Sequence, residues 1–418
     1  MKNGMLRKLA AVLLAVVMVI GLTACGGGSD SNEVTLTYWC MWEASETQGM
    51  ALQEAVDAFT AETGIKVDLQ FKGRQGIREG LQPALDAKTE IDIFDEDVDR
   101  VNGNWGNYII DLEDYFKNSS LAKQSRPAFV QWCRDAGGGT LKTIPYQESV
   151  FAFHYNKDIF DKAGVTKAPE TWDEFVAVCE QIRAAGYDPI CDDVDYIDCM
   201  YGYALARLIG QDAAEEMYMN GTWKEVPEAL EAAKLFEDLA KRGLFSSTIA
   251  SSPWPNAQNV ELGGGTAAME FCGSWLPNEI RGVTGDDFEW GGFAFPDIPG
   301  QKEGREANNT SFQVFAINKE SKHPDEAFKL IEWLSTGKWD QNLTEKSWGI
   351  PSDPTNTNVP DPQVDFAKIC DATTVRYQWA AAAENNGDIV GPLMENFCRL
   401  CGGQITSEEF IDAMAAAY

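Results

Sequence analysis

The most constraining feature of this sequence is a strand, a helix and a second strand within residues 34–71. Residues 34–38 alternate between apolar and polar side chains, as expected of a strand with one buried face. Residues 52–59 place Leu, Val and Phe at helical spacing, and Gly64 follows as a helix stop signal. Residues 65–71 alternate again. Because strands joined through a helix run parallel, the pattern predicts an α/β fold that begins with a parallel sheet.

An acidic run follows the next predicted strand. Residues 91–94 are typical of a short buried strand, and its carboxyl end continues into Asp-Glu-Asp-Val-Asp-Arg at 95–100. Ligands of open α/β sheets gather outside the carboxyl ends of the strands. We therefore expect this run to lie close to a ligand.

Later segments carry helical signals. Thr171 and Glu174 form a capping box, residues 228–241 have one apolar face, and a further helix is predicted after Pro324. Residues 351–362 are polar and proline-rich, which favours a surface loop or a crossing between lobes. About 385 residues follow position 33, a length that favours two lobes over one core.

The first 24 residues have the order of a secretory signal: three basic residues, an apolar run and a small-residue cleavage site. Leu22-Thr23-Ala24-Cys25 resembles the bacterial lipobox, which implies that Cys25 is lipidated. The polar, glycine-rich residues 26–33 then predict a flexible tether. The folded part is expected on the extracytoplasmic face of the membrane; an ordinary secreted protein is the alternative.

Charge narrows the class of partner. The formal net charge is −31, and removal of residues 1–24 with their three basic side chains lowers it to −34. So negative a surface repels phosphate backbones and anionic lipid headgroups. Nucleic acid is therefore not expected as a partner, and contact with the membrane is expected through the lipid anchor only.

Cysteine usage argues against a disulfide framework. Nine of the ten cysteines remain once Cys25 is set aside, and an odd number leaves at least one free thiol. Cys398 and Cys401 have the spacing of a redox or zinc motif, but no second pair accompanies them. Buried thiols are expected.

Few residues are available for catalysis. His154 and His323 are the only histidines, and no Gly-x-Ser-x-Gly elbow accompanies them. His154 lies in a strand-like run and is expected to be structural. The glycine triplets at 137–139 and 263–265 lack the Lys-Ser/Thr ending of a phosphate loop and predict turns. The acidic run lacks the glycine and glutamate of a calcium loop, so neither a metal nor another cofactor is expected.

Tryptophan is abundant, with thirteen residues, and several lie outside typical core positions. Flat apolar rings beside carboxylates, amides and arginines suit a sugar, because the rings cover the apolar faces of the pyranose while polar groups bind its hydroxyls. The tryptophans concerned are Trp39, Trp42, Trp275, Trp348 and Trp379.

A series of short motifs extends over nearly the whole mature chain. They are 36–39 (LTYW), 59–66 (FTAETGIK), 91–94 (IDIF), 155–160 (YNKDIF), 171–175 (TWDEF), 265–269 (GTAAM) with 273–275 (GSW), and 315–318 (FAIN) before 322–327 (KHPDEA). Taken in this order, the motifs resemble those of the family 1 extracellular solute-binding proteins, the maltose-binding-protein class that serves sugar ABC importers.

The resemblance implies an α/β, two-lobed periplasmic-binding-protein-like fold of type II, with a ligand cleft between lobes joined by a hinge that the chain crosses about three times. We place the crossings near Val150, Val314 and Pro351. The predicted segments are a signal peptide (1–24), the lipidated cysteine with its tether (25–33), lobe 1 (34–150 plus 314–352) and lobe 2 (151–313 plus 353–418).

The resemblance also implies the ligand-binding residues. The family's late stacking aromatic has no counterpart near Ile389, so Trp348 or Trp379 is expected to replace it. Glu96 stands where the maltose binder has an aromatic ring, which argues against maltose itself. The predicted set is Trp42 and Glu43 in a first loop, Glu96, Asp99 and Arg100 in a second, Gln147 and Glu148 at the first hinge crossing, and Trp275, Trp348 and Trp379.

The implied function is capture of a carbohydrate, an oligosaccharide in particular, and its delivery to the permease subunits of an ABC importer by a monomeric, lipid-anchored protein. No catalytic residue is assigned. A lipid-anchored glycoside hydrolase, which needs similar aromatics and acids, and a surface carbohydrate adhesin are the alternatives.

Overall fold

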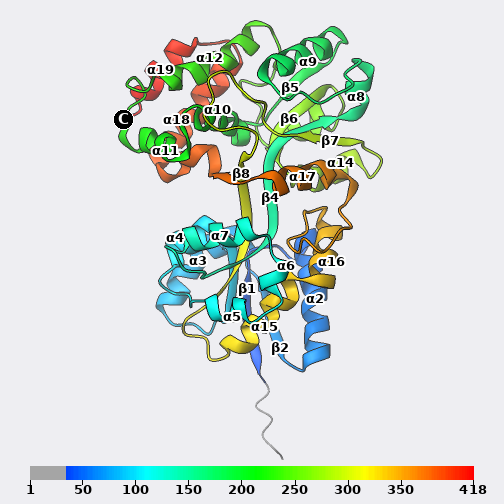
Figure 1. Cartoon of the computed structure of the whole chain (residues 1–418), viewed down its shortest axis with the longest axis vertical. Coiled ribbons are helices and arrows are strands. Elements are labelled where there is room, and N and C mark those ends of the chain that lie inside the picture. The colour runs from blue at the N-terminus through cyan, green and yellow to red at the C-terminus, as the bar shows by residue number, and fades with distance from the viewer. Residues whose placement is uncertain (1–33) are drawn as a thin grey trace, which may run out of the picture.

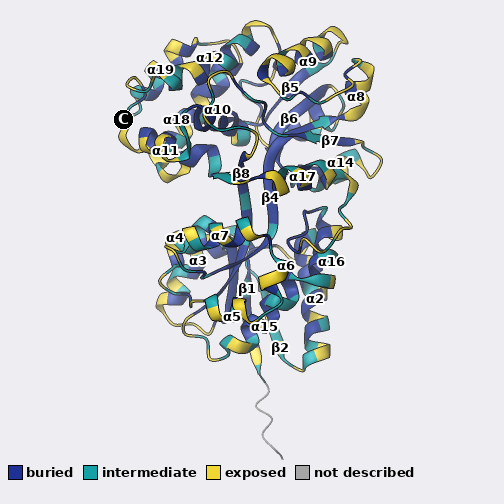
Figure 2. Ribbon diagram, viewed as in Figure 1, coloured by how far each residue is buried: buried dark blue, intermediate teal, exposed yellow. Residues whose placement is uncertain are grey.

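The computed structural model describes residues 34–418, which form two lobes (Figure 1). The predicted signal, lipidation site and tether lie outside the described residues. Two long strands, β4 (Ile144–Asn156) and β8 (Ala307–Ile317), run from one lobe into the other. Most of their residues are buried, as Figure 2 shows. Within residues 34–418, no helix combines the length and the apolar character that crossing a membrane requires.

A single sheet path passes through both lobes, in the order β2-β1-β3-β8-β4-β6-β5. The predicted strand-helix-strand unit is confirmed, because β1 pairs in parallel with β2 and β3. At the centre, β8 pairs antiparallel with both β3 and β4. The remaining strands are β1 (Thr35–Cys40), β2 (Lys66–Phe71), β3 (Ile93–Asp97), β5 (Asp188–Cys191), β6 (Ala267–Gly273), β7 (Trp290–Phe293) and β9 (Val375–Tyr377).

The first lobe packs its helices around its own hydrophobic core. Its helix α2 ends at Gly64, whose φ of 76° is the left-handed conformation that glycine adopts without strain. The helices are α2 (Thr47–Thr63), α3 (Gly73–Asp86), α4 (Val98–Trp105), α5 (Glu113–Lys117), α6 (Leu121–Gln124), α7 (Pro127–Ala136), α15 (Pro324–Ser335) and α16 (Gly337–Ser347).

Most of the second lobe packs around a separate core, although the buried Phe366, Ala367 and Cys370 of α17 belong to the first core. The predicted capping box of Thr171 and Glu174 is confirmed at the start of α9, and the helix predicted over 228–241 is α12. The helices are α8 (Lys157–Lys162), α9 (Trp172–Ala184), α10 (Val194–Ile209), α11 (Gln211–Asn220), α12 (Pro227–Lys241), η1 (Ala257–Leu262), α13 (Leu276–Glu279), α14 (Arg281–Thr284), η2 (Asp361–Gln363), α17 (Val364–Ala372), η3 (Trp379–Asn385), α18 (Gly387–Cys401) and α19 (Ser407–Ala415).

One strand boundary differs from the prediction. The strand expected at 91–94 is β3, which begins at Ile93 and continues to Asp97. Asp95 and Glu96 therefore lie inside the strand and are fully buried. Sequence patterning missed this because acidic residues rarely occupy a strand interior without partners. Here Asp95 has such a partner: it accepts a hydrogen bond of 2.9 Å from the backbone N–H of Met41.

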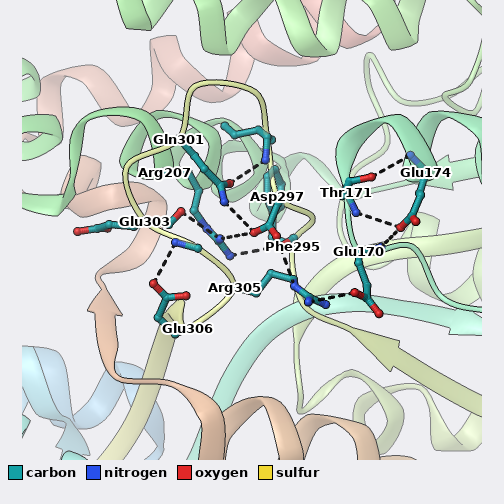
Figure 3. Close-up of polar contacts among 12 residues, drawn as sticks. Glu170, Thr171, Glu174, Arg207, Phe295, Asp297, Gln301, Glu303, Arg305 and Glu306 are labelled. Atoms are coloured by element: carbon teal, nitrogen blue, oxygen red, sulfur yellow. Dashed lines mark hydrogen bonds and ion pairs between the residues drawn. The ribbon is translucent and has the colours of Figure 1, made fainter.

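A buried arginine fixes the loop that leads into β8 (Figure 3). Arg207 of α10 donates to the backbone carbonyls of Phe295 at 3.3 Å and Glu303 at 3.4 Å, and it lies 3.6 Å from the carboxylate of Asp297. Arg305 approaches the same carboxylate at 3.7 Å. Because the guanidinium of Arg207 binds two backbone carbonyls as well as a carboxylate, it fixes the position of the loop that precedes β8.

The thiols and His154 are structural in character. All nine cysteines of the described residues are free and buried. His154 is fully buried, and its Nε2 lies 3.0 Å from the carbonyl oxygen of Gly273. Burial lowers the pKa of His154 to about 3, so the ring is neutral at physiological pH.

Several carboxyl groups are buried together in the second lobe. Glu270 on β6 is fully buried, and neither of its carboxylate oxygens has a hydrogen-bond partner within residues 34–418. Burial, reinforced by Asp192 and Asp193, raises the pKa of Glu270 well above its usual value. Burial likewise raises the pKa of Asp198 to about 7 and that of Asp193 to about 6. The fold therefore keeps carboxyl groups protonated at a pH where the unfolded chain ionises them.

We expect the folded protein to be less stable at pH 8 than at pH 5.5. The pKa of these carboxyl groups is higher in the folded chain than in the unfolded chain, where it is near 4. Their contribution to the free energy of unfolding is therefore fully present below pH 4 and is lost as the pH rises through the folded-state pKa. Calorimetric unfolding midpoints at several pH values test this. The variant Glu270→Gln keeps the shape and removes one titrating group, so its midpoint should fall less between the two pH values. An equal fall in both proteins would exclude Glu270 as a source of the pH dependence.

Candidate functional site at the interlobe junction

Two sets of side chains connect the lobes on either side of the β4–β8 crossing. In the first set, Asn278 of α13 donates to Thr47 at the start of α2 at 3.1 Å. The guanidinium carbon of Arg281, on α14, lies 3.9 Å from the ring centroid of Trp348, which follows α16. We call the residues that meet across the two lobes the interlobe junction.

The second set is made of ion pairs. Asp99 of α4 forms a bidentate pair with Arg376 of β9, at 2.7 and 3.0 Å. Arg100 lies 3.7 Å from Glu384 of η3. Asp99 and Arg100 belong to the predicted ligand-binding set, and each forms an ion pair with a residue of lobe 2.

Two half-buried tryptophans lie together at the lobe 2 side of the junction. The rings of Trp275 and Trp379 stack with 7° between their planes and 6.4 Å between their centroids. Phe151 of β4 presents its edge to both rings, at 5.2 and 5.0 Å. Tyr196 contacts both rings from α10. The four rings form one aromatic cluster, of which the two indoles are only half covered.

Both indoles belong to segments that reach the first lobe. Trp275 directly precedes α13, whose Asn278 contacts Thr47. Trp379 opens η3, whose Glu384 pairs with Arg100. The indole pair therefore lies at the interlobe junction, although its members are far apart in the sequence.

Trp42 is almost fully buried, so most of its ring faces protein and not solvent. It is 5% exposed, and its indole Nε1 donates to the hydroxyl of Tyr146 at 2.9 Å. That hydroxyl donates in turn to Asp95. Burial raises the pKa of Asp95 to about 7. The guanidinium of Arg74 covers the indole face at 4.6 Å, so Trp42 meets the junction through a cation–π pair.

Glu43 is exposed and lies against the start of α3. A Cβ at Gly73 would approach its carboxylate to 2.1 Å, and the φ of Gly73 is +69°. Only glycine allows this close approach. Arg74 follows directly and pairs with Glu46 at 2.8 Å. This part of lobe 1, close in sequence to the junction residue Thr47, therefore offers one exposed carboxylate beside an arginine.

Glu96 is occupied by a protein partner. Its fully buried carboxylate accepts two hydrogen bonds of 3.2 Å from Arg78 of α3. Asp97, the next residue, caps α4 by accepting from the backbone N–H of Asp99 at 2.9 Å. Burial, together with the charge of Asp99, raises the pKa of Asp97 to about 6.

Gln147 and Glu148 lie where β4 passes between the lobes, at an irregularity in its pairing with β8. Gln147 has a φ of +49°, a conformation that a non-glycine residue adopts only where its surroundings enforce it. Its amide lies 3.5 Å from the hydroxyl of Ser347. Glu148 is buried and accepts from Arg126 at 2.5 Å. Burial raises the pKa of Glu148 to about 8, although Arg126 opposes the shift.

The structure therefore brings Trp275, Trp379, Asp99, Arg100 and Trp348 to the junction, and it directs Glu96 and Glu148 toward arginines within the fold. Sequence reasoning missed Arg74, Tyr196, Asn278 and Arg376. Arg74 and Arg78 do carry a signal, since residues four apart share a helix face. Tyr196 and Asn278 carry none, because their place depends on how the lobes meet.

Residues 34–418 contain no group of three or more His, Cys, Asp or Glu side chains arranged to hold a metal ion. In particular, Asp95, Asp97 and Asp99 engage Met41, the start of α4 and Arg376 separately. The junction itself offers apolar ring faces together with charged and amide hydrogen-bonding groups.

Comparison with known proteins gives a family match. A model of the bacterial extracellular solute-binding protein family matches residues 43–340. A putative binding protein of Brucella abortus is 25% identical over 370 residues, which cover 83% of this chain and 82% of the relative. The multiple sugar-binding protein of Streptococcus mutans is 28% identical over 207 residues, 47% of each chain.

A solved structure shares the fold. A chitin oligosaccharide binding protein superimposes with a TM-score of 0.69 at 22% sequence identity, covering 92% of this chain and 98% of its own. The predicted α/β, two-lobed fold is confirmed by this likeness and by the sheet that passes through both lobes.

We expect Asp99→Asn to loosen the interlobe junction. Loss of a charge-assisted hydrogen bond costs about 1.5 kcal/mol, roughly a factor of ten in an equilibrium constant. Small-angle X-ray scattering at low salt should give a larger radius of gyration for the variant than for the wild type. Asp238→Asn is the control, because Asp238 pairs with Arg242 at 2.7 Å within one helix region of lobe 2. Equal radii for all three proteins would show that the Asp99–Arg376 pair does not hold the lobes together.

Proposed function

This chain belongs to the bacterial extracellular solute-binding protein family, and from that premise we propose that it captures a carbohydrate, in particular an oligosaccharide, between its lobes and delivers it to the membrane permease of an ABC importer. The family consists of binding proteins that act outside the cytoplasm, so the chain is not an enzyme and the glycoside hydrolase alternative is set aside. Two of its relatives are named as sugar-binding proteins.

The observation that carries the carbohydrate proposal is the pair formed by Trp275 and Trp379. Two half-buried parallel indoles present flat apolar surface next to polar groups. A pyranose ring has apolar C–H faces and a rim of hydroxyls, so it gains from stacking on such surface while its hydroxyls find donors and acceptors. Glu43, Arg74 and Asn278 provide these groups at the same junction.

The geometry supports Trp379, and not Trp348, as the replacement for the missing late aromatic. Trp379 stacks on Trp275. Trp348, in contrast, has Arg281 over its ring at 3.9 Å. We therefore assign Trp348 to closure of the lobes and Trp379 to the ligand.

Affinity in this proposal comes from a sum of modest terms. A micromolar ligand requires about 8 kcal/mol, which stacking on two rings and a few charge-assisted hydrogen bonds supply after the cost of ordering the ligand. Hinge closure is the established motion of periplasmic binding proteins. We propose the lobe boundaries 34–150 plus 314–352 and 151–313 plus 353–418 for that motion, and a monomer as the working form.

A thermal-shift screen against a glycan library is the direct test. A ligand present at one hundred times its Kd adds about 2.7 kcal/mol to the free energy of unfolding, so hits should raise the midpoint clearly. Stabilisation by short soluble oligosaccharides supports the importer role. Binding only to polysaccharides or host surfaces would instead favour the adhesin alternative.

We expect Trp379→Ala to weaken binding of a screened sugar by more than tenfold, because it removes one ring of the pair and about 1.4 kcal/mol corresponds to each factor of ten. Isothermal calorimetry measures the change. Trp132→Ala is the matched control, since Trp132 is also half-buried but packs on Phe129 and Phe312 in lobe 1. Equal affinities for wild type and Trp379→Ala would remove Trp379 from the site.

We also propose that Cys25 anchors the protein to the outer face of the cell membrane through lipid. In expressing cells the wild type is then expected in the membrane fraction, and Cys25→Ser in the soluble extracytoplasmic fraction, because the thiol that carries the lipid is gone. Immunoblots of the fractions measure this. The same distribution for both proteins would contradict the anchor and leave the binding function untouched.

A further inference from the structure

Trp254 is the one tryptophan of residues 34–418 that is exposed to solvent, with 48% of its surface accessible. It lies in lobe 2, three residues before the start of η1. An indole costs free energy when left in water, because it is the largest apolar side chain. Its exposure at a defined place therefore calls for an explanation.

The loop that carries Trp254 is anchored on both sides by one buried carboxylate. Asp193 accepts from the hydroxyl of Ser252 at 3.3 Å, and from the backbone N–H groups of Ala257 at 2.7 Å and Gln258 at 3.3 Å. These partners flank Trp254 in the sequence. Asp193 thus fixes both ends of the loop that carries the exposed indole of Trp254.

The indole has a carboxylate beside it. Burial raises the pKa of Glu279, and the side chains of Trp254 and Gln258 both interact with Glu279 and oppose the rise of its pKa. Glu279 is exposed to solvent, and the positive charge of Arg74 in lobe 1 lies near enough to act on it. An exposed ring and an exposed carboxylate therefore lie side by side in lobe 2, within electrostatic reach of an arginine of lobe 1.

A short helix links this ring to the indole pair. Trp275 precedes α13 and Glu279 ends it, so about 6 Å of helix separates the two positions along the axis. Asn278, between them, contacts Thr47 of lobe 1. Trp275, Asn278 and Glu279 therefore follow one another along α13, and Trp254 lies beside the end of this helix at Glu279.

We propose that Trp254 and Glu279 form an outer subsite for a sugar ring of an oligosaccharide whose inner rings stack on Trp275 and Trp379. This inference rests on the proposed function and adds chain length to it: the protein prefers oligosaccharides that extend beyond the junction. The indole of Trp254 covers a pyranose face, and Glu279 accepts from hydroxyls at the ring edge.

Calorimetry with malto-, xylo- and chito-oligosaccharides of two to six rings tests the subsite. For the series that the wild type binds, Trp254→Ala should lower affinity for the longest member at least fivefold and for the two-ring member less than twofold. Trp254→Phe should restore most of the loss, because a flat ring is retained. Val260→Ala is the control: Val260, in the adjoining η1, is 59% exposed but offers no ring.

The outcomes separate the subsite from the function beneath it. A wild type that binds no oligosaccharide of the panel overturns the carbohydrate proposal and the subsite with it. A wild type that binds, with a Trp254→Ala variant that loses nothing or loses equally at every length, overturns the subsite alone. Import of the sugars into cells gives a third outcome. If Trp254→Ala and Val260→Ala both reduce import at every sugar length while sugar affinity is unchanged, the surface binds a protein partner, and the subsite is overturned.

Discussion

The antiparallel pairing of β4 with β8 joins the two lobes and positions every other element. The two strands pair in lobe 1 and at the crossing, from Ile144 opposite Phe315 to Val150 opposite Thr310, and then separate in lobe 2 to pair with other strands. Each lobe is built outward from one end of this ribbon. The two hydrophobic cores lie largely in different lobes, an arrangement that suits the hinge closure of periplasmic binding proteins.

Charge at the crossing restrains that bending. Arg126 joins Glu148 of β4 to Asp371 of α17, at 2.5 and 2.8 Å, and also binds the backbone carbonyl of Pro351. Arg126 thus connects β4 with the segment at Pro351 and with α17. The Asp99–Arg376 pair connects the lobes through an arginine that is nearly as buried as Arg126 and a carboxylate that is 39% exposed. The fully buried Glu148 is costly to leave without Arg126, whereas Asp99 can be hydrated when its pair opens. The Arg126–Glu148 contact is therefore suited to be permanent and the Asp99–Arg376 contact to be reversible.

Local sequence signals predicted the early part of the fold well. The alternation of residues 34–38 and 65–71 gave the parallel pair of strands, Gly64 the end of α2, and Thr171 with Glu174 the start of α9. The boundary of β3 was predicted wrongly, because Asp95 is kept in the strand by Met41 and Tyr146 from elsewhere in the chain. No pattern within a few residues reports such partners. The same holds for the candidate site. The sequence indicated which types of residue would lie there, but it did not indicate which residues would contact one another.

The α/β class, the helix ends and the supply of tryptophans in polar surroundings depend on periodicity and composition over short stretches, so they can be inferred from the order of amino acids alone. Which of these side chains meet depends on the folded arrangement of the chain. Trp379 stacks on Trp275 and Trp348 does not, because β9 pairs with β8 and brings the start of η3 beside α13. Glu148 faces Arg126 because an irregularity in β4 turns the strand at that point. These placements come from strand pairing between distant segments, whose register is set by the packing of the whole molecule.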